Sequence, residues 1–137
     1  MKFEAETFIT VQFYDLDPMN VVWHGNYIKY LETARCDLLS KLGYDYDNMR
    51  EDGIAYPVAT MDLKFMKPCT FNQKLRIVSY VEEIEPCLII KYTIFDAVSG
   101  EKLFKAKTMQ ICIDVRTKES LYSAPVRLKE KLACCNL

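Results

Sequence analysis

The sequence of 137 residues carries 18 basic and 19 acidic side chains, so its net charge at neutral pH is −1. A chain of this length usually folds as one domain, and we expect a single domain over residues 1–137. Half of the residues are hydrophobic, but no run of about eighteen apolar residues predicts a membrane span. The even charge balance, without a basic stripe, argues against nucleic acid as a partner.

Cysteine and histidine are placed in a way that does not favour a metal site. The six cysteines form no C-x-x-C pair, and the one histidine, His24, has no cysteine within a few residues of it. We therefore expect free thiols, with no disulfide framework, no metal and no cofactor. Free thiols persist in reducing compartments, and the first residues lack the apolar core of a signal peptide. The sequence thus predicts a cytoplasmic protein.

The first part of the chain changes from a strand period to a helix period. Residues 5–14 alternate between apolar and polar side chains, which predicts a strand. One side of this strand would carry Thr7, Ile9, Val11 and Phe13. After a polar turn, apolar residues recur at spacings of three and four, as on one face of an amphipathic helix. These residues are Tyr27, Tyr30, Leu31, Ala34, Leu38 and Leu42. Gly25 and Asn26 suit the start of this helix, and Gly43 suits its end.

Four further strands are predicted after the helix. The segments with strand character are residues 57–66, 73–82, 87–96 and 102–114. In the last of them, one face would carry Leu103, Met109, Ile111 and Ile113. Short connections with turn residues predict antiparallel hairpins, and residues 126–132 predict a short terminal helix.

The fold class that follows is α+β. One strand, one long helix and four more strands pack economically when an antiparallel sheet of about five strands wraps around the helix. Open edge strands would remain on such a sheet, and a dimer that joins two sheets edge to edge would cover them.

The residues that can carry chemistry gather between the first strand and the helix. Residues 13–27 contain Asp15, Asp17, the only histidine and the only tryptophan. The first N–H groups of a helix have no partner within it and lie at the positive end of its dipole, so they can polarise a thioester carbonyl. A nearby carboxylate could attack that carbonyl or take a proton from an attacking water. Since a thiolate leaves readily, no metal is needed.

The pattern D-x-D-P-x-x-V-V-W-x-x-N-Y, followed by E-x-A-R on the helix, resembles the 4-hydroxybenzoyl-CoA thioesterase family. The V-V-W-H-x-N-Y run looks closest to the small acyl-CoA thioesterases associated with the Tol-Pal system. The resemblance implies a hotdog fold and the hydrolysis of a short- or medium-chain or aromatic acyl-CoA. It also implies that Asp17 is the catalytic carboxylate, as nucleophile or general base, and that a backbone N–H near His24 polarises the carbonyl.

The same resemblance supplies further site residues. His24 matches a histidine thought to assist catalysis, and Asn26 and Tyr27 match positions at the mouth of the active site. Other candidates for the substrate pocket are Trp23, Met61 and Phe65. The CoA phosphates would be met by Lys64, Lys67, Arg76 and Lys91. The expected assembly is a homodimer or homotetramer.

Several alternatives stay open at this point. Asp15 and Asp17 are also common turn formers, and the turn or structural role is the favoured one for Asp15. The thioester could belong to an acyl carrier protein, docked on Lys102, Lys105 and Lys107. A hydratase is disfavoured because it uses another local pattern, and a non-catalytic acyl-CoA-binding protein could share the fold.

Overall fold

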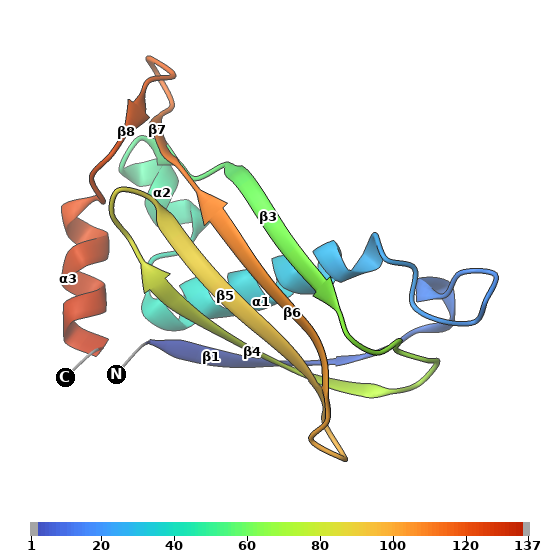
Figure 1. Cartoon of the computed structure of the whole chain (residues 1–137). Helices are drawn as coiled ribbons and strands as arrows, with labels where there is room; N and C mark the ends of the chain where they lie inside the picture. Colours follow the sequence, from blue (N-terminus) through green and yellow to red (C-terminus); the bar gives the residue numbers. More distant parts are fainter. Residues whose placement is uncertain (1–2, 136–137) are drawn as a thin grey trace.

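The structure is a computed structural model that describes residues 3–135. The elements in chain order are β1 Glu4–Thr10, the 3₁₀ turn η1 Phe13–Asp15, α1 Asn26–Leu42, α2 Tyr46–Glu51, β2 Ile54–Ala55, β3 Val58–Phe65, β4 Lys74–Glu83, β5 Leu88–Asp96, β6 Lys102–Gln110, β7 Cys112–Asp114, β8 Ser120–Leu121 and α3 Val126–Cys135. A five-stranded antiparallel sheet has the order β1-β4-β5-β6-β3, and a small sheet has the order β2-β7-β8. The long helix α1 lies across one face of the large sheet (Figure 1). This is the α+β arrangement expected from the sequence.

Helix α1 forms where the period of three and four residues predicted it. Every residue of the predicted apolar face is buried, and Leu31, Ala34 and Leu38 have no exposed surface. Gly25 precedes the first turn, and Gly43 ends the helix in the left-handed conformation, with φ of +85°, where its N–H donates to the carbonyl of Leu39. The buried face packs on inward side chains of the sheet, among them Ile77, Ile90, Ile94 and Phe104.

Polar contacts hold α1 in place along β1. The hydroxyl of Thr7 donates to Asp37 at 2.7 Å, and the ammonium of Lys41 donates to the carbonyl of Glu4 at 2.9 Å. Because β1 is the outermost strand on this side, these contacts fix the helix against the sheet edge. They also fix where the chain leaves β1 and begins the segment that leads to α1.

Two predicted strands end earlier than the sequence suggested. Strand β1 stops at Thr10, and Phe13 lies in the 3₁₀ turn with 77% of its surface exposed, so its predicted place on one strand face with Thr7 and Ile9 was wrong. The predicted strand 102–114 is two strands separated at Ile111. A register shift in the β5–β6 pairing buries both Leu103 and Phe104. The buried face of β6 therefore continues through the even-numbered positions, not through Met109 as predicted.

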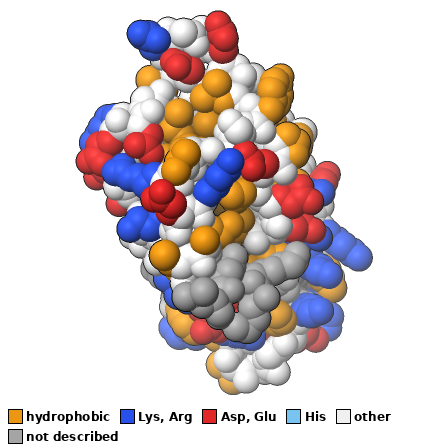
Figure 2. Space-filling model, turned by 90° about the vertical axis from the view of Figure 1, so that its left-hand side faces the viewer, with side chains coloured by type: hydrophobic (Ala, Val, Ile, Leu, Met, Phe, Trp, Pro, Cys, Tyr) orange, Lys and Arg blue, Asp and Glu red, His pale blue; other side chains and the backbone are white. Residues whose placement is uncertain are grey.

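The end of the molecule that carries α3 was predicted only in outline. The terminal helix is present, but α2, β2 and β8 had no clear signal in the sequence. On this face acidic and basic side chains lie next to one another (Figure 2). Arg127 pairs with Glu51 at 2.8 Å, and Lys129 pairs with Glu85 at 3.0 Å. Such exposed pairs contribute little individually, but they join α3 to the α2 end of the fold.

Candidate active site

The segment between β1 and α1 folds back on itself as a very short hairpin. Leu16 bridges to Val22, and Val21 bridges to Thr70 in the loop after β3. The N–H of Asp17 donates to the carbonyl of Val21 at 2.8 Å, and Asn20 takes the left-handed conformation, with φ of +64°, at the turn. Residues 15–22 are therefore fixed by backbone bonds both to each other and to the end of β3.

Asp15 is the structural carboxylate of this segment. It is 9% exposed, and its Oδ2 accepts hydrogen bonds from the Tyr30 hydroxyl and the Gln12 N–H, both at 2.9 Å. Its backbone carbonyl accepts from the Trp23 N–H at 2.9 Å and from the Asn26 side chain at 2.8 Å. Burial and the bond to Asp15 raise the pKa of the Tyr30 hydroxyl. The favoured structural role of Asp15 agrees with these contacts.

Asp17 has one engaged oxygen and one free oxygen. Its Oδ1 accepts the Met19 N–H at 2.8 Å and the Val21 N–H at 3.5 Å, so it closes the turn as an Asx motif. Its Oδ2 has no hydrogen-bond partner among residues 3–135. Asp17 is half-buried and lines a cavity. The turn-forming role and a reactive role are thus compatible, because each uses a different oxygen.

The start of α1 offers unpaired donors beside that cavity. The N–H groups of Asn26 and Tyr27 bond back to Trp23 and His24, whereas the N–H groups of His24 and Gly25 have no acceptor among residues 3–135. A Cβ on Gly25 would lie 2.3 Å from an atom of the Trp23 ring, so the ring lies directly over this glycine. The position therefore suits only glycine while Trp23 stays where it is.

The cavity is a pocket of about 280 Å³ lined by Asp17, Val21, Val22, His24, Tyr27, Phe65, Met66, Lys67 and Pro68. Its base is aromatic: the ring of Tyr27 stacks on Phe104 with centroids 4.6 Å apart and meets Phe65 edge-on at 5.2 Å. Burial, followed by contact with the Cys69 thiol, raises the pKa of Tyr27. Burial also raises the pKa of the Cys69 thiol, which disfavours the thiolate form that a nucleophilic cysteine needs.

The structure brings together four of the residues predicted for catalysis and substrate binding. Asp17, His24, Tyr27 and Phe65 share the pocket, while Asn26 is buried behind it. Trp23, 49% exposed, and Met61, half-buried on β3, lie outside the lining. Sequence reasoning missed Val21, Val22, Met66 and Pro68 as lining residues. For the last two, the loop directly after a strand was the signal that could have indicated them.

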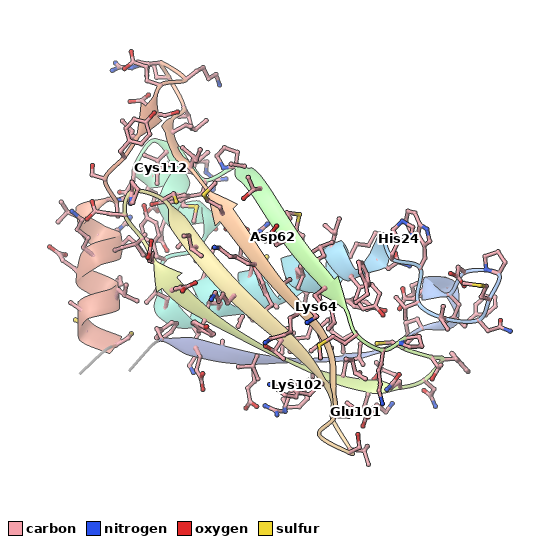
Figure 3. All side chains as sticks on the ribbon, in the orientation of Figure 1. His24, Asp62, Lys64, Glu101, Lys102 and Cys112 are labelled. Atoms are coloured by element: carbon pink, nitrogen blue, oxygen red, sulfur yellow. The ribbon has the colours of Figure 1, made fainter. Side chains whose placement is uncertain are left out.

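The four cations predicted to meet CoA do not lie together. Lys67 lines the pocket and pairs with Glu101 at 2.6 Å. Lys64 and Lys91 line a separate groove of about 460 Å³ on the other face of the large sheet, which also contains Lys102, Lys105 and Lys107. In Figure 3 His24 lies at the start of α1, and Lys64 and Lys102 lie on β3 and β6. Arg76 pairs with Glu6 at 2.9 Å and stacks over the Phe95 ring, which lines that groove.

No group of three or more His, Cys, Asp or Glu side chains is arranged to hold a metal ion within residues 3–135. In the same part of the chain, no helix has the length and apolarity that crossing a bilayer requires.

The sequence profile described as the Thioesterase-like superfamily matches residues 11–133. The chain belongs to this superfamily. The long-chain acyl-CoA thioesterase FadM of Escherichia coli is 27% identical over 128 residues, which are 93% of this chain and 96% of that protein. The 1,4-dihydroxy-2-naphthoyl-CoA hydrolase of Thermosynechococcus vestitus is 25% identical over 108 residues, 77% of this chain and 73% of that protein.

Solved structures agree with the family assignment. The crystal structure of a DHNA-CoA thioesterase from Staphylococcus aureus, 32% identical, superposes with a TM-score of 0.80 and covers 87% of this chain and 80% of that one. The hotdog fold and the enzyme class expected from the sequence, a thioester hydrolase, are confirmed. The narrower likeness to the Tol-Pal-associated branch stays a prediction.

Proposed function

We propose that this protein hydrolyses acyl-CoA thioesters in the pocket between residues 15–25, the start of α1 and the end of β3. The observation that carries the proposal is that a carboxylate and unpaired backbone N–H groups lie close to one small cavity. Asp17, with one carboxylate oxygen that has no partner among residues 3–135, lines the same pocket as His24 and Tyr27, and the unpaired N–H groups of His24 and Gly25 lie just before the first turn of α1. Relatives named as acyl-CoA hydrolases, FadM among them, support CoA as the carrier of the acyl group.

The chemistry follows from where charge develops. The thioester carbonyl oxygen accepts hydrogen bonds from the helix start, which stabilise the oxyanion formed on attack. Asp17 Oδ2 either attacks the carbonyl carbon, releasing CoA thiolate and leaving an anhydride that water hydrolyses, or removes a proton from an attacking water. Both routes produce the free acid and CoA. His24, exposed at the rim of the pocket, assists by donating a proton to the departing sulfur.

The residues that line the pocket suggest which part of the substrate each of them would contact. Tyr27 and Phe65 offer ring faces and edges to the first carbons of a short- or medium-chain or aromatic acyl group. Lys67 stands at the rim and is the cation best placed for the CoA phosphates, which would compete with Glu101 for it. Lys64, Arg76 and Lys91 stay weaker proposals for CoA, because the sheet lies between them and Asp17.

The open edge of the large sheet supports a homodimer. Strand β3 pairs with β6 on one side and with no other strand of residues 3–135, and all eight of its residues are exposed or half-buried. Phe65 and Met66 are 50% and 41% exposed at the end of this strand. An unpaired edge of this length invites pairing, and a two-fold axis through β3 would join two such sheets. Size-exclusion chromatography with light scattering distinguishes this dimer from the homotetramer that the sequence also allows. The free thiols, Cys36 and Cys69 among them, support a reducing compartment such as the cytoplasm.

A carrier-protein thioester is the second candidate substrate. On β6, Lys105 opposes Lys64 of β3 and Lys107 opposes Lys91 of β5, while Lys107 also faces Asp62 of β3 and Lys91 pairs with Glu82 at 3.3 Å. Like charges opposed in this way destabilise a sheet, so an anionic partner would relieve their repulsion. Charge reversal at Lys105 and Lys107 would then reduce turnover of an acyl-carrier-protein thioester while leaving acyl-CoA turnover intact.

The test is CoA release from a panel of acyl-CoAs by wild type, Asp17→Asn and Asp62→Asn. Asn keeps the Oδ1 acceptor that closes the turn but replaces the free carboxylate oxygen with an amide group. Asp62 is an exposed carboxylate on the outer face and serves as the matched control. We expect turnover that Asp17→Asn abolishes and Asp62→Asn preserves. Turnover that survives in Asp17→Asn would refute the assignment. CoA release is followed with a thiol-reactive dye. The signal of enzyme-only reactions is subtracted, because the dye also reacts with exposed thiols such as Cys36.

A further inference from the structure

A groove of about 460 Å³ crosses the face of the large sheet that points away from α1. We call it the outer groove. Its charged lining residues are one carboxylate, Asp62, and five lysines: Lys64, Lys91, Lys102, Lys105 and Lys107. In Figure 3 Asp62, Lys64 and Lys102 follow one another along β3 and β6. The volume is that of an ordinary small-molecule site, and the proposed hydrolysis at Asp17 does not use it.

Three of the five lysines have no anionic partner. Lys107 faces Asp62 in the β3–β6 pairing, and Lys91 pairs with Glu82 at 3.3 Å. The remaining three form no ion pair within residues 3–135; they are Lys64, Lys102 and Lys105. The outer groove therefore keeps an excess of positive charge that its own carboxylate does not neutralise.

The unpaired lysines gather at one end of the groove. Lys105 lies directly opposite Lys64 in the β3–β6 pairing, and Lys102 begins the same strand, β6. Glu101, the residue before Lys102, is held by Lys67 at 2.6 Å. Like charges opposite one another destabilise a sheet, and a hollow lined by one sign of charge concentrates counter-ions. This end of the groove thus suits an anion with several charges.

An aromatic platform adjoins these lysines. Phe95 lines the outer groove and lies opposite Lys102 in the β5–β6 pairing. The Arg76 guanidinium lies over the Phe95 ring, 4.5 Å from its centroid, and pairs with Glu6 at 2.9 Å. Nucleobases stack on aromatic rings and on guanidinium planes. A ligand that has both a base and phosphates therefore matches this end of the groove better than a plain polyanion does.

We propose that the outer groove binds a free nucleoside polyphosphate, with its base on the platform of Phe95 and Arg76 and its phosphates on the three unpaired lysines. The inference goes beyond the proposed function and does not depend on it. Lysine ammonium groups bind phosphates as point charges. A second copy of the chain, packed on this groove about a two-fold axis, would set lysines against lysines, so like-charge repulsion disfavours that occupant.

The first test is isothermal titration calorimetry of wild type with ATP and with inorganic tripolyphosphate, without Mg²⁺ and at about 0.1 M salt. We expect one saturable site per chain for ATP. Tripolyphosphate should bind at least threefold more weakly, because it has no base to stack. Absence of saturable ATP binding would overturn the inference. Equal affinities would overturn it too, since they would indicate a general anion surface of the kind that an acidic carrier protein needs.

The second test removes charge inside and outside the groove. One variant combines Lys102→Gln with Lys105→Gln. The matched control combines Lys118→Gln with Lys131→Gln, two exposed sites outside the groove, so both variants have the same net charge. We expect ATP affinity to fall at least tenfold in the first variant and to stay within about twofold in the control. Equal losses would show that ATP responds to overall charge, which would overturn the inference.

Folding is checked in the same variants. Because the groove lysines repel one another, replacing Lys102 and Lys105 should not lower Tm. A loss of ATP affinity at unchanged Tm is then a loss of the site and not of the fold.

The third test removes the platform. Phe95→Leu should weaken ATP binding at least threefold and leave tripolyphosphate within about twofold. Arg76→Lys keeps the positive charge but removes the planar group, so it is the second variant in case Phe95→Leu does not fold, and the same pattern is expected. Unchanged ATP affinity in the folded variants would overturn the assignment of a nucleotide.

The last test asks whether the outer groove is separate from the place where CoA binds. At saturating ATP, we expect KM for an acyl-CoA to stay within about twofold of its value without ATP. A KM that rises in proportion to ATP would place ATP where CoA binds and would overturn the inference. If wild type cleaves no acyl-CoA, the proposed function fails, while the calorimetric titrations still test the groove independently.

Discussion

Of the contacts in the segment that carries the active site, we expect the hydrogen bond between Tyr30 and Asp15 to contribute most to the free energy of unfolding. The Tyr30 hydroxyl donates to Asp15 Oδ2 at 2.9 Å, and both residues are buried. Tyr30→Phe removes the hydroxyl and leaves a buried carboxylate with one donor fewer. A hydrogen bond to a charged group contributes roughly 1.5–3 kcal/mol, so the free energy of unfolding should fall by about this amount.

The corresponding change in melting temperature follows from chain length. An unfolding entropy of about 2.1 cal/mol/K per residue gives roughly 0.3 kcal/mol/K for this protein, so Tm should fall by about 5–10 °C. Tyr92→Phe is the matched control, because the Tyr92 hydroxyl is also buried but bonds to the neutral hydroxyl of Thr108 at 3.1 Å and faces the Arg35 guanidinium, not a carboxylate. A neutral bond contributes about 0.5–1.5 kcal/mol, and its loss should lower Tm by about 2–5 °C.

Thermal unfolding followed by circular dichroism measures both variants. The decisive quantity is the difference between them, since both remove one hydroxyl from a buried ring. A Tyr30→Phe variant whose Tm falls no more than that of Tyr92→Phe would refute the structural role given to the Asp15 carboxylate. Turnover of Tyr30→Phe should fall only a few-fold at a temperature where it is folded, because Asp17 is not altered.

Three further predictions concern the same region. Gly25→Ala forces the Trp23 ring off the helix start, so the emission maximum of this single tryptophan should shift. Phe104→Leu removes two aromatic contacts at the base of the pocket, including the stack with Tyr27. It should lower the free energy of unfolding in urea by about 1–3 kcal/mol. Since the folded-state pKa of Tyr30 is raised above its ordinary value of 10.0, the stability it contributes is complete below pH 10 and is lost as pH rises above that value. The loss of Tm between pH 9 and pH 11 should be smaller in Tyr30→Phe than in wild type, and an equal loss would contradict this.

The sequence predicted the elements whose side chains follow a regular period. The apolar face of α1 continues through four turns, and a glycine in the left-handed conformation marks its end, so both the helix and its stop could be located. Strand character over residues 73–82 located β4, whose buried residues include Leu75 and Ile77. Alternation fails at a bulge, because one extra residue reverses the faces. The shift beside Leu103 is such a point, and nothing in the local sequence indicates it.

The sequence located the segment that carries the site, but it did not predict how the side chains of that segment are arranged. Asp15 and Asp17 are two residues apart in the same turn, and no pattern says that Tyr30 would engage one of them and leave an oxygen of the other free. That distinction depends on a contact between residues fifteen positions apart. Alternation of side chains along residues 57–66 implies that the neighbours Lys64 and Phe65 point to opposite faces. The structure places Phe65 in the pocket of Asp17 and Lys64 in the separate groove.

The assignment of Asp17 as the catalytic carboxylate is tested most directly by two variants, Asp17→Asn and Asp15→Asn. In both, kcat/KM for an acyl-CoA and Tm are compared with wild type. We expect Asp17→Asn to lose at least a hundredfold in kcat/KM while its Tm stays within about 2 °C of wild type, because the turn keeps its acceptor oxygen. Asp15→Asn should show the reverse, with a clear loss of Tm and a smaller loss of kcat/KM. An Asp17→Asn enzyme within tenfold of wild type would contradict the assignment of Asp17 as the catalytic carboxylate.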